Sequence, residues 1–156
     1  MTPLFNLDTF DERRDILKLV HMVLSEDSRL ELVFGGQEPT PKGVYDCILL
    51  SQQAWVFTSL KTRRILGVAG ISKLPMEGSI MIPWYLSSGF ETKCPLQFYR
   101  AAQGLLNYWE TQYFNSTLVN VCLNKPRVTK FLTSLGFTVE KSTREFTKFY
   151  KKIGGP

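Results

Sequence analysis

The residues that usually carry nucleophilic, metal-binding or acid–base chemistry are sparse in this chain. Cys47, Cys94 and Cys122 are too few and too scattered for a disulfide framework or a zinc site, so we expect reduced thiols like those of cytosolic proteins. The single histidine, His21, lies on the polar side of a helical pattern, which indicates a solvated ring rather than a catalytic base. No pairing of Glu with His stands out as a general base. The sequence therefore predicts no metal site and leaves the catalytic residues unknown.

Length and composition are those of one globular domain, which we expect to span residues 1–156. Hydrophobic residues make up 44% and charged residues 21%, which excludes a disordered, collagen-like or coiled-coil chain. No apolar run approaches the roughly 18–20 residues of a transmembrane helix, and no signal peptide is visible. We therefore expect no membrane span and no secretion. Nineteen basic and fourteen acidic residues give a net charge of +5, which permits weak, salt-sensitive contact with nucleic acid.

Apolar residues at helical spacing predict four helices. The first is expected from Thr9 to Leu24, capped by Asp8 or Thr9. The residues that recur at helical spacing are Phe10, Arg13, Leu17, Val20 and Leu24, with Ile16, Leu19 and Val23 alongside. The others are expected at Ser28–Phe34, from Pro95 to about Tyr113, and from the predicted cap Asn124 to a left-handed end at Gly136. Residues Gly43–Gln52 are ambiguous between helix and strand.

Strand patterns fill most of the remaining chain. Ala54–Leu60 and Ile65–Ser72 predict an antiparallel hairpin, in which Gly67 and Gly70 indicate a bulge or a close approach. A turn at Pro75–Gly78 leads to a strand at Ser79–Leu86, and Pro83 inside it predicts an edge strand or a break. Further strands are expected at Thr117–Leu123, Thr138–Glu140 and Phe146–Lys151. This order predicts an α+β or mixed α/β three-layer arrangement.

Two late segments give this order a family likeness. Asn124-Lys125-Pro126 and Ser134-Leu135-Gly136-Phe137, on either side of a short helix, resemble the late motif of the GNAT family of acyl-CoA-dependent N-acetyltransferases. The resemblance implies a GNAT-like central mixed sheet flanked by helices. It covers most of the chain by element order and about twenty residues, Val119–Phe137, by motif.

Two departures from the family pattern concern the cofactor and the acid. GNAT enzymes carry a glycine-rich loop before the long helix, whose backbone N–H groups bind the pyrophosphate of coenzyme A. Here the loop is Ser87 to Pro95, with Gly89 as its one glycine and Glu91 adding negative charge. Many members also carry a tyrosine general acid in the late helix, and the position four residues before Gly136 is Leu132.

The resemblance also implies where acyl-CoA would bind if the chain were active. The backbone of Tyr85, Leu86 and Ser87 would pair with the pantetheine arm. The N–H groups of Ser88, Gly89 and the residues before the long helix would hold the pyrophosphate, and Asn124 would orient near the thioester. The alternative for Ser87 and Ser88 is an ordinary turn, and the alternative for Asn124 is a helix cap.

A GNAT scaffold with an impaired cofactor loop is similar to the internal virion protein A family of short-tailed phages. The local likeness lies in Trp84-Tyr85-Leu86-Ser87-Ser88 and in Phe131–Gly136. It implies a non-catalytic or vestigial acyltransferase scaffold without a cofactor. Such a protein would contact virion or host proteins during assembly or infection, in the host cytoplasm or the virion. The alternatives are an active N-acetyltransferase using acetyl-CoA and an inhibitor that binds a host factor.

Overall fold

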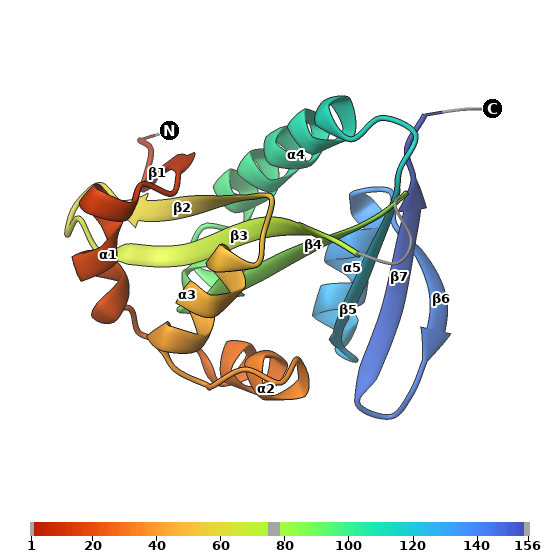
Figure 1. Cartoon of the computed structure of the whole chain (residues 1–156), viewed down its shortest axis with the longest axis horizontal. Helices are drawn as coiled ribbons and strands as arrows, with labels where there is room; N and C mark the ends of the chain where they lie inside the picture. Colours follow the sequence, from red (N-terminus) through yellow and green to blue (C-terminus); the bar gives the residue numbers. More distant parts are fainter. Residues whose placement is uncertain (1, 75–78, 155–156) are drawn as a thin grey trace. The chain divides into compact units, whose positions relative to one another are not determined.

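The computed structural model describes residues 2–74 and 79–154 (Figure 1). Its helices are α1 (Glu12–Val20), α2 (Glu26–Phe34), α3 (Pro41–Leu49), α4 (Pro95–Gln112) and α5 (Pro126–Ser134), with a short 3-10 helix, η1, at Phe90–Thr92. Its strands are β1 (Phe5–Thr9), β2 (Gln53–Ser59), β3 (Ile65–Lys73), β4 (Ile80–Ser87), β5 (Thr117–Leu123), β6 (Thr138–Ser142) and β7 (Phe146–Lys152). The predicted turn at Pro75–Gly78 lies outside the described residues.

The strands form a seven-stranded mixed sheet in the order β1-β2-β3-β4-β5-β7-β6, which confirms the predicted fold class. The chain divides into two compact units. Unit 1 comprises residues 1–72 and 84–98, and unit 2 comprises residues 73–83 and 99–156. The expectation of a single domain over 1–156 stays a prediction.

Unit 1 has an aliphatic core that the helices α1, α2 and α3 share with β2, β3 and β4. Its buried members include Leu19, Leu32, Val44, Val56, Val68 and Leu86, and Trp84 packs against them. All three helices come from the single connection between β1 and β2 (Figure 1). The ambiguous segment Gly43–Gln52 is helical as far as Leu49, where Val44 and Ile48 lie one turn apart and both enter this core.

A second core in unit 1 is aromatic. Its rings belong to Phe5, Phe57, Tyr85, Phe90 and Phe98, with ring centroids 5.1–5.8 Å apart in the contacting pairs. Because successive side chains of a strand point to opposite faces, Tyr85 enters this aromatic cluster whereas its neighbours Trp84 and Leu86 belong to the aliphatic core.

The predicted hairpin is confirmed, and its two glycines are sites of close approach. A Cβ at Gly67 would lie 2.8 Å from the Tyr85 hydroxyl oxygen, and one at Gly70 would lie 2.4 Å from the Trp84 indole. The register between β2 and β3 also shifts between Phe57 and Thr58. Both of the proposed roles of the glycine-bearing strand, a bulge and a close approach, are therefore present in this hairpin.

Unit 2 joins the first half of β4 to β5, β7 and β6. β4 pairs parallel with β5 at Ile80↔Thr117 and Met81↔Leu118, and β5 pairs antiparallel with β7 along its whole length. The Asn120 side-chain amide donates to the Pro83 carbonyl. β4 runs through Pro83 and has a neighbour on both sides in the strand order, so the expected edge position is wrong. The pairing of β4 with β5 ends at Met81, before Pro83, which has no backbone N–H to donate.

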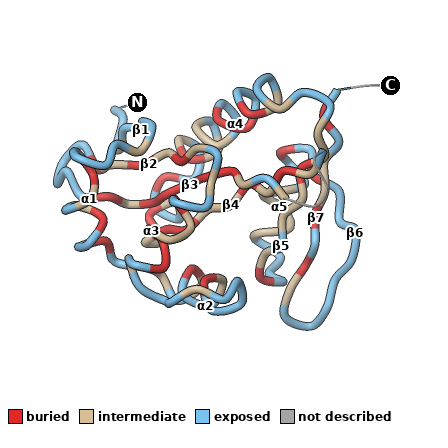
Figure 2. Tube along the Cα trace, in the orientation of Figure 1, coloured by how far each residue is buried: buried red, intermediate tan, exposed pale blue. Residues whose placement is uncertain are grey.

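The helix α5 ends as its sequence predicts. Gly136 has φ +95°. The Phe137 N–H donates to the Leu132 carbonyl, five residues earlier, at 3.1 Å, as in a Schellman motif. Phe137 is buried behind this turn. The strand β6 that follows is exposed along its length (Figure 2).

The N-terminal prediction is wrong in two respects. Residues Phe5–Thr9 form β1 and pair with β2, so the helix begins only at Glu12, with Asp11 as its cap. The predicted face is also wrong, because Leu17 and Val20 are 74% and 61% exposed. Apolar residues occur on two sides of this short helix, and it is the side of Leu19 that meets the aliphatic core. The predicted solvation of His21 is confirmed, since it is exposed at the end of α1.

Candidate functional site

The end of β4 carries five of the six predicted cofactor-binding residues, all in unit 1. Ser88 is tied to the neighbouring strand, because both its backbone N–H and its hydroxyl donate to the Leu66 carbonyl at 2.9 Å. The N–H that was expected to face a pyrophosphate therefore completes a bond to β3.

Gly89 is the glycine on which the phosphate loop depends. Its N–H donates to the Ser87 side-chain oxygen at 3.0 Å, and its φ of +90° is left-handed, which explains why a glycine stands here. Its carbonyl accepts from the Thr92 N–H and hydroxyl, at 3.3 and 2.9 Å. The second expected pyrophosphate donor is thus also engaged within the chain.

Ser87 meets the beginning of α2 through both of its backbone groups. Its N–H donates to the Ser28 hydroxyl at 2.8 Å, and its carbonyl accepts from the Ser25 N–H at 2.9 Å. Successive N–H groups of a strand point to opposite edges. Since Ser88 bonds toward β3, Ser87 presents its groups to the other edge, and the first turn of α2 occupies them.

A carboxylate lies next to this loop. The Ser87 hydroxyl donates to Glu91 Oε1 at 2.6 Å, and among the described residues neither Glu91 Oε2 nor the Tyr85 hydroxyl has a hydrogen-bond partner although both atoms are buried. Burial and then the Glu91 charge raise the pKa of Tyr85 well above its ordinary value. The phenol therefore stays protonated near neutral pH, and Glu91 places a carboxylate beside the predicted phosphate loop.

The two bulky side chains of this region turn inward. Trp84 donates its indole N–H to the Ser51 hydroxyl at 2.7 Å and packs on the aliphatic core. Phe90 is buried in the aromatic cluster. Leu86 is buried in the aliphatic core, so the side chains of Tyr85 and Leu86 serve packing.

Asn124 belongs to unit 2, whereas the other five residues belong to unit 1. Its side-chain amide donates to the Thr143 carbonyl at 2.8 Å, and its N–H donates to the Glu145 carbonyl at 2.8 Å. The cap position of α5 is Lys125, whose side chain does not cap the helix. The predicted cap is therefore wrong, because the Asn124 side chain fastens the β6–β7 connection instead.

Sequence reasoning did not find Ser25 and Ser28. Ser25 caps α2, since its hydroxyl accepts from the Ser28 N–H at 3.2 Å. A serine before the acidic pair Glu26 and Asp27 is a recognisable helix start, so this cap was visible in the sequence. The hydrogen bond between Ser28 and Ser87 joins residues 59 positions apart, and no local sequence pattern indicates it.

Other chemistry is sparse in the described part of the chain. Cys47, Cys94 and Cys122 form no disulfide within the described residues, and burial raises the pKa of Cys47 and of Cys94. Within residues 2–74 and 79–154, no group of three or more His, Cys, Asp or Glu side chains is placed to hold a metal ion. In the same ranges no helix combines the length and the apolar character needed to cross a membrane.

Comparisons with known proteins agree with this architecture. No protein-family model matches the sequence, and no curated protein matches it. An N-acetyltransferase from Staphylococcus aureus Mu50 is similar in structure, with a TM-score of 0.69 and 10% identity over 97% of this chain and 100% of that chain. A GCN5-related N-acetyltransferase from Kribbella flavida has a TM-score of 0.68 and 14% identity, over 96% of this chain and 98% of that chain.

A third similar structure contains the cofactor. RimL, a ribosomal L7/L12 alpha-N-protein acetyltransferase solved in complex with coenzyme A, has a TM-score of 0.62 and 15% identity over 97% of this chain and 96% of that chain. The structural similarity establishes the fold, whereas sequence identities this low leave the activity open. The chain has the fold of the GCN5-related N-acetyltransferases.

Proposed function

We propose that this chain is a non-catalytic, vestigial acyltransferase scaffold that acts through protein contacts. The observation that carries the proposal is the state of the β4 end, where the N–H groups of Ser87, Ser88 and Gly89 all donate within the chain. An acyl-CoA molecule must either break these bonds or bind without them.

The electrostatics of the loop support the same conclusion. Glu91 lies within hydrogen-bond distance of Ser87 and would repel a diphosphate. Phosphate sites at helix starts depend on N–H groups that remain available and on positive potential. Pro95 begins α4 without an N–H, so the long helix contributes one donor fewer than an ordinary first turn.

The helical layer of unit 1 supports contact with proteins. Large apolar side chains are exposed on α1, α2 and α3 and at their ends, which is uncommon for a surface with no partner. They are Leu17, Val20, Val23, Leu30, Val33, Phe34, Leu49 and Leu50. Following the likeness to the internal virion proteins, the partner is a virion or host protein, met in the host cytoplasm or during particle assembly.

Calorimetric titration with acetyl-CoA and with coenzyme A tests the loss of the cofactor site. We expect no saturable heat and no thermal shift up to millimolar ligand. Saturable binding at micromolar ligand that is weakened by Gly89→Asp and by Ser88→Glu, together with acyl transfer to an amine, would contradict the proposal. Gly104→Asp on α4 is the matched control, since a side chain at Gly104 meets no atom within 4 Å.

Affinity purification from infected cells and from cells expressing the chain alone tests the partner. We expect a partner that is lost when Leu17, Val20 and Val23 are all changed to Glu and kept when the exposed Arg13 on the same helix is changed to Glu. A partner found only after infection identifies a virion protein. One found in both samples identifies a host protein and favours the inhibitor alternative.

An active N-acetyltransferase is the second candidate, favoured by the fold shared with the coenzyme A complex over nearly the whole chain. Its mechanism would consist of positioning an amine and a thioester, with a base reached through water. Detection of acetylated product in the calorimetric samples decides between the two candidates.

A further inference from the structure

A polar pocket of about 140 Å³ lies in unit 1, away from the β4 end. Its walls come from β1, from α1, from the end of β2 and from the turn that follows β2. The charged and polar side chains used below are Asn6, Asp8, Arg14, Lys18, Thr58 and Arg63. Arg14 and Lys18 are four residues apart and so lie on one side of α1.

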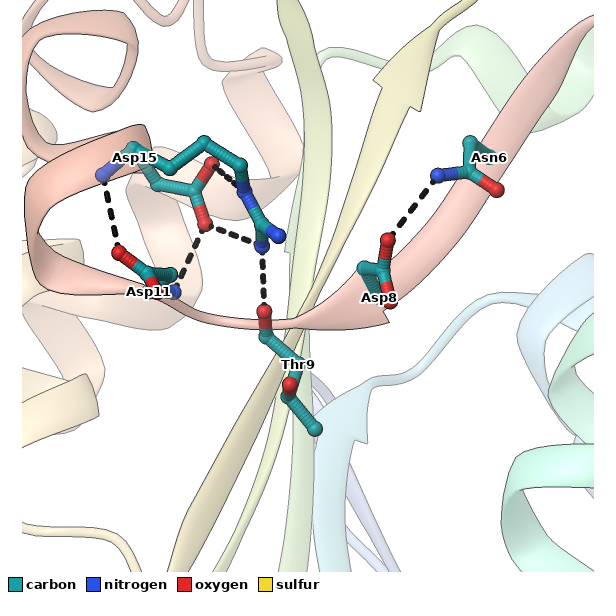
Figure 3. Close-up of polar contacts among 6 residues, drawn as sticks. Asn6, Asp8, Thr9, Asp11 and Asp15 are labelled. Carbon is teal, nitrogen blue, oxygen red and sulfur yellow. Dashed lines mark hydrogen bonds and ion pairs between the residues drawn. The ribbon is translucent and has the colours of Figure 1, made fainter.

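The charges of this pocket are unbalanced toward positive. Arg14, Lys18 and Arg63 contribute three positive charges and Asp8 one negative charge. Asp15, which pairs with Arg14, contributes a second negative charge, and this leaves a net charge of +1. Asp8 accepts a hydrogen bond from the Asn6 amide at 3.2 Å on the same face of β1 (Figure 3). The carboxylate is thereby held against the strand.

Arg14 is held in a fixed position. Its Nε and Nη2 donate to the two carboxylate oxygens of Asp15, each at 2.9 Å, and Nη2 also donates to the Thr9 carbonyl at 2.5 Å. Asp15 is fully buried and also accepts from the Asp11 N–H at 2.8 Å (Figure 3). The two remaining N–H groups, on Nη1, enter none of these bonds, so the guanidinium can serve a ligand without changing its conformation.

The backbone of the turn after β2 is strained at the residue that completes the pocket. Arg63 has φ +66°, a left-handed conformation that favours glycine or asparagine in a hairpin turn. The register shift at Thr58 is in the same hairpin. Strained residues and bulges gather at binding sites because the surrounding structure maintains them for function.

We propose that this pocket binds a tetrahedral anion, namely a phosphate monoester or inorganic phosphate. The excess of cationic side chains attracts an anion, and the volume accommodates one tetrahedral group with its waters. Arg14 and Arg63 donate to its oxygens through guanidinium groups, Lys18 adds a third positive charge, and the hydroxyl of Thr58 and the amide of Asn6 face the same space.

NMR titration of the ¹⁵N-labelled chain with inorganic phosphate and with a phosphoserine peptide tests this site at low salt. We expect saturable shifts at the amides of Asn6 and Thr58. Arg63→Gly and Lys18→Gln each weaken binding about fivefold, as expected for one partly exposed charge, and Asp8→Asn strengthens it. The melting temperature of Arg63→Gly does not fall, because glycine relieves the left-handed backbone.

The matched control is Arg64→Gln, which removes the same charge one residue further along and outside the pocket. Equal losses for Arg63→Gly and Arg64→Gln, or no saturable shift with either probe, would overturn the proposal. Saturation by phosphate alone identifies a free-anion site, whereas tighter binding of the phosphopeptide identifies a phosphorylated partner. Because coenzyme A also carries phosphate groups, titrating it into Arg63→Gly separates this pocket from the β4 end.

Discussion

The bond between Ser87 and Ser28 offers the sharpest test of how the β4 end is closed. Ser28 is buried, and its hydroxyl accepts from the Ser87 N–H at 2.8 Å. Its own N–H donates to the Ser25 hydroxyl. Ser28→Ala therefore removes the acceptor of one buried donor while it leaves the helix cap in place.

The expected loss follows from two opposing effects. A buried N–H left without an acceptor costs about 1–3 kcal/mol, and alanine regains up to about 0.5 kcal/mol of helix propensity over serine. The free energy of unfolding should fall by roughly 0.5–3 kcal/mol. For a chain of this length that corresponds to a melting temperature lower by about 1–12 °C.

Urea unfolding and thermal melting measure this difference, and hydrogen exchange at the Ser87 amide locates it. Ser134→Ala is the control, since Ser134 is exposed and its hydroxyl donates to the carbonyl of Phe131 in its own helix. Its effect should stay within about 0.5 kcal/mol. If Ser28→Ala were as stable as Ser134→Ala and the Ser87 amide exchanged at an unchanged rate, α2 would not seal the strand.

Three other changes probe the packing and the charges of the fold. Gly70→Ala should lower the free energy of unfolding by about 1–3 kcal/mol, because its Cβ would overlap Trp84. Gly104→Ala on α4 has open space around it and should raise the free energy of unfolding by up to about 1 kcal/mol. Urea unfolding compares the two variants. Because the pKa of Tyr85 is raised in the folded chain, the unfolded chain loses the phenol proton at lower pH, and stability should decline as pH rises above 10.0. Tyr85→Phe should reduce that decline in melts recorded from pH 8 to about 11. Asp15→Asn should cost about 1–3 kcal/mol, because it weakens the charged hydrogen bonds that the carboxylate accepts from Arg14 and because the guanidinium left behind is partly exposed to solvent. A melt equal to that of the unchanged chain would show that the pair contributes nothing.

Most of the fold was predictable because its strands and its long helices have strong local patterns. The hairpin of β2 and β3, the limits of β5 and the glycine ending of α5 follow from residue types over short stretches. The strand β1 was missed, because its five residues alternate too briefly to outweigh the helical spacing that follows. Its pairing with β2 connects residues about fifty positions apart, which a local pattern does not contain.

The candidate site was predictable in its composition and not in its bonds. The sequence shows that Gly89 is the one glycine of the loop and that Glu91 follows it. It does not show that Ser28 reaches Ser87, because serine is compatible with a cap, a turn or a surface. Asn124 illustrates the same limit, since its side chain meets Thr143 rather than the helix that follows it.

The three engaged N–H groups at the β4 end also explain why one substitution should not restore an acyl-CoA site. Each intramolecular bond contributes about 0.5–1.5 kcal/mol net, so a ligand that displaces those of Ser87, Ser88 and Gly89 loses roughly ten- to a thousandfold in affinity. Ser28→Ala releases only the first of them, and the other two remain with Leu66 and Ser87. Coenzyme A should therefore bind the Ser28→Ala variant less than about tenfold more tightly than the unchanged chain, and a larger gain would show that α2 alone blocks the ligand.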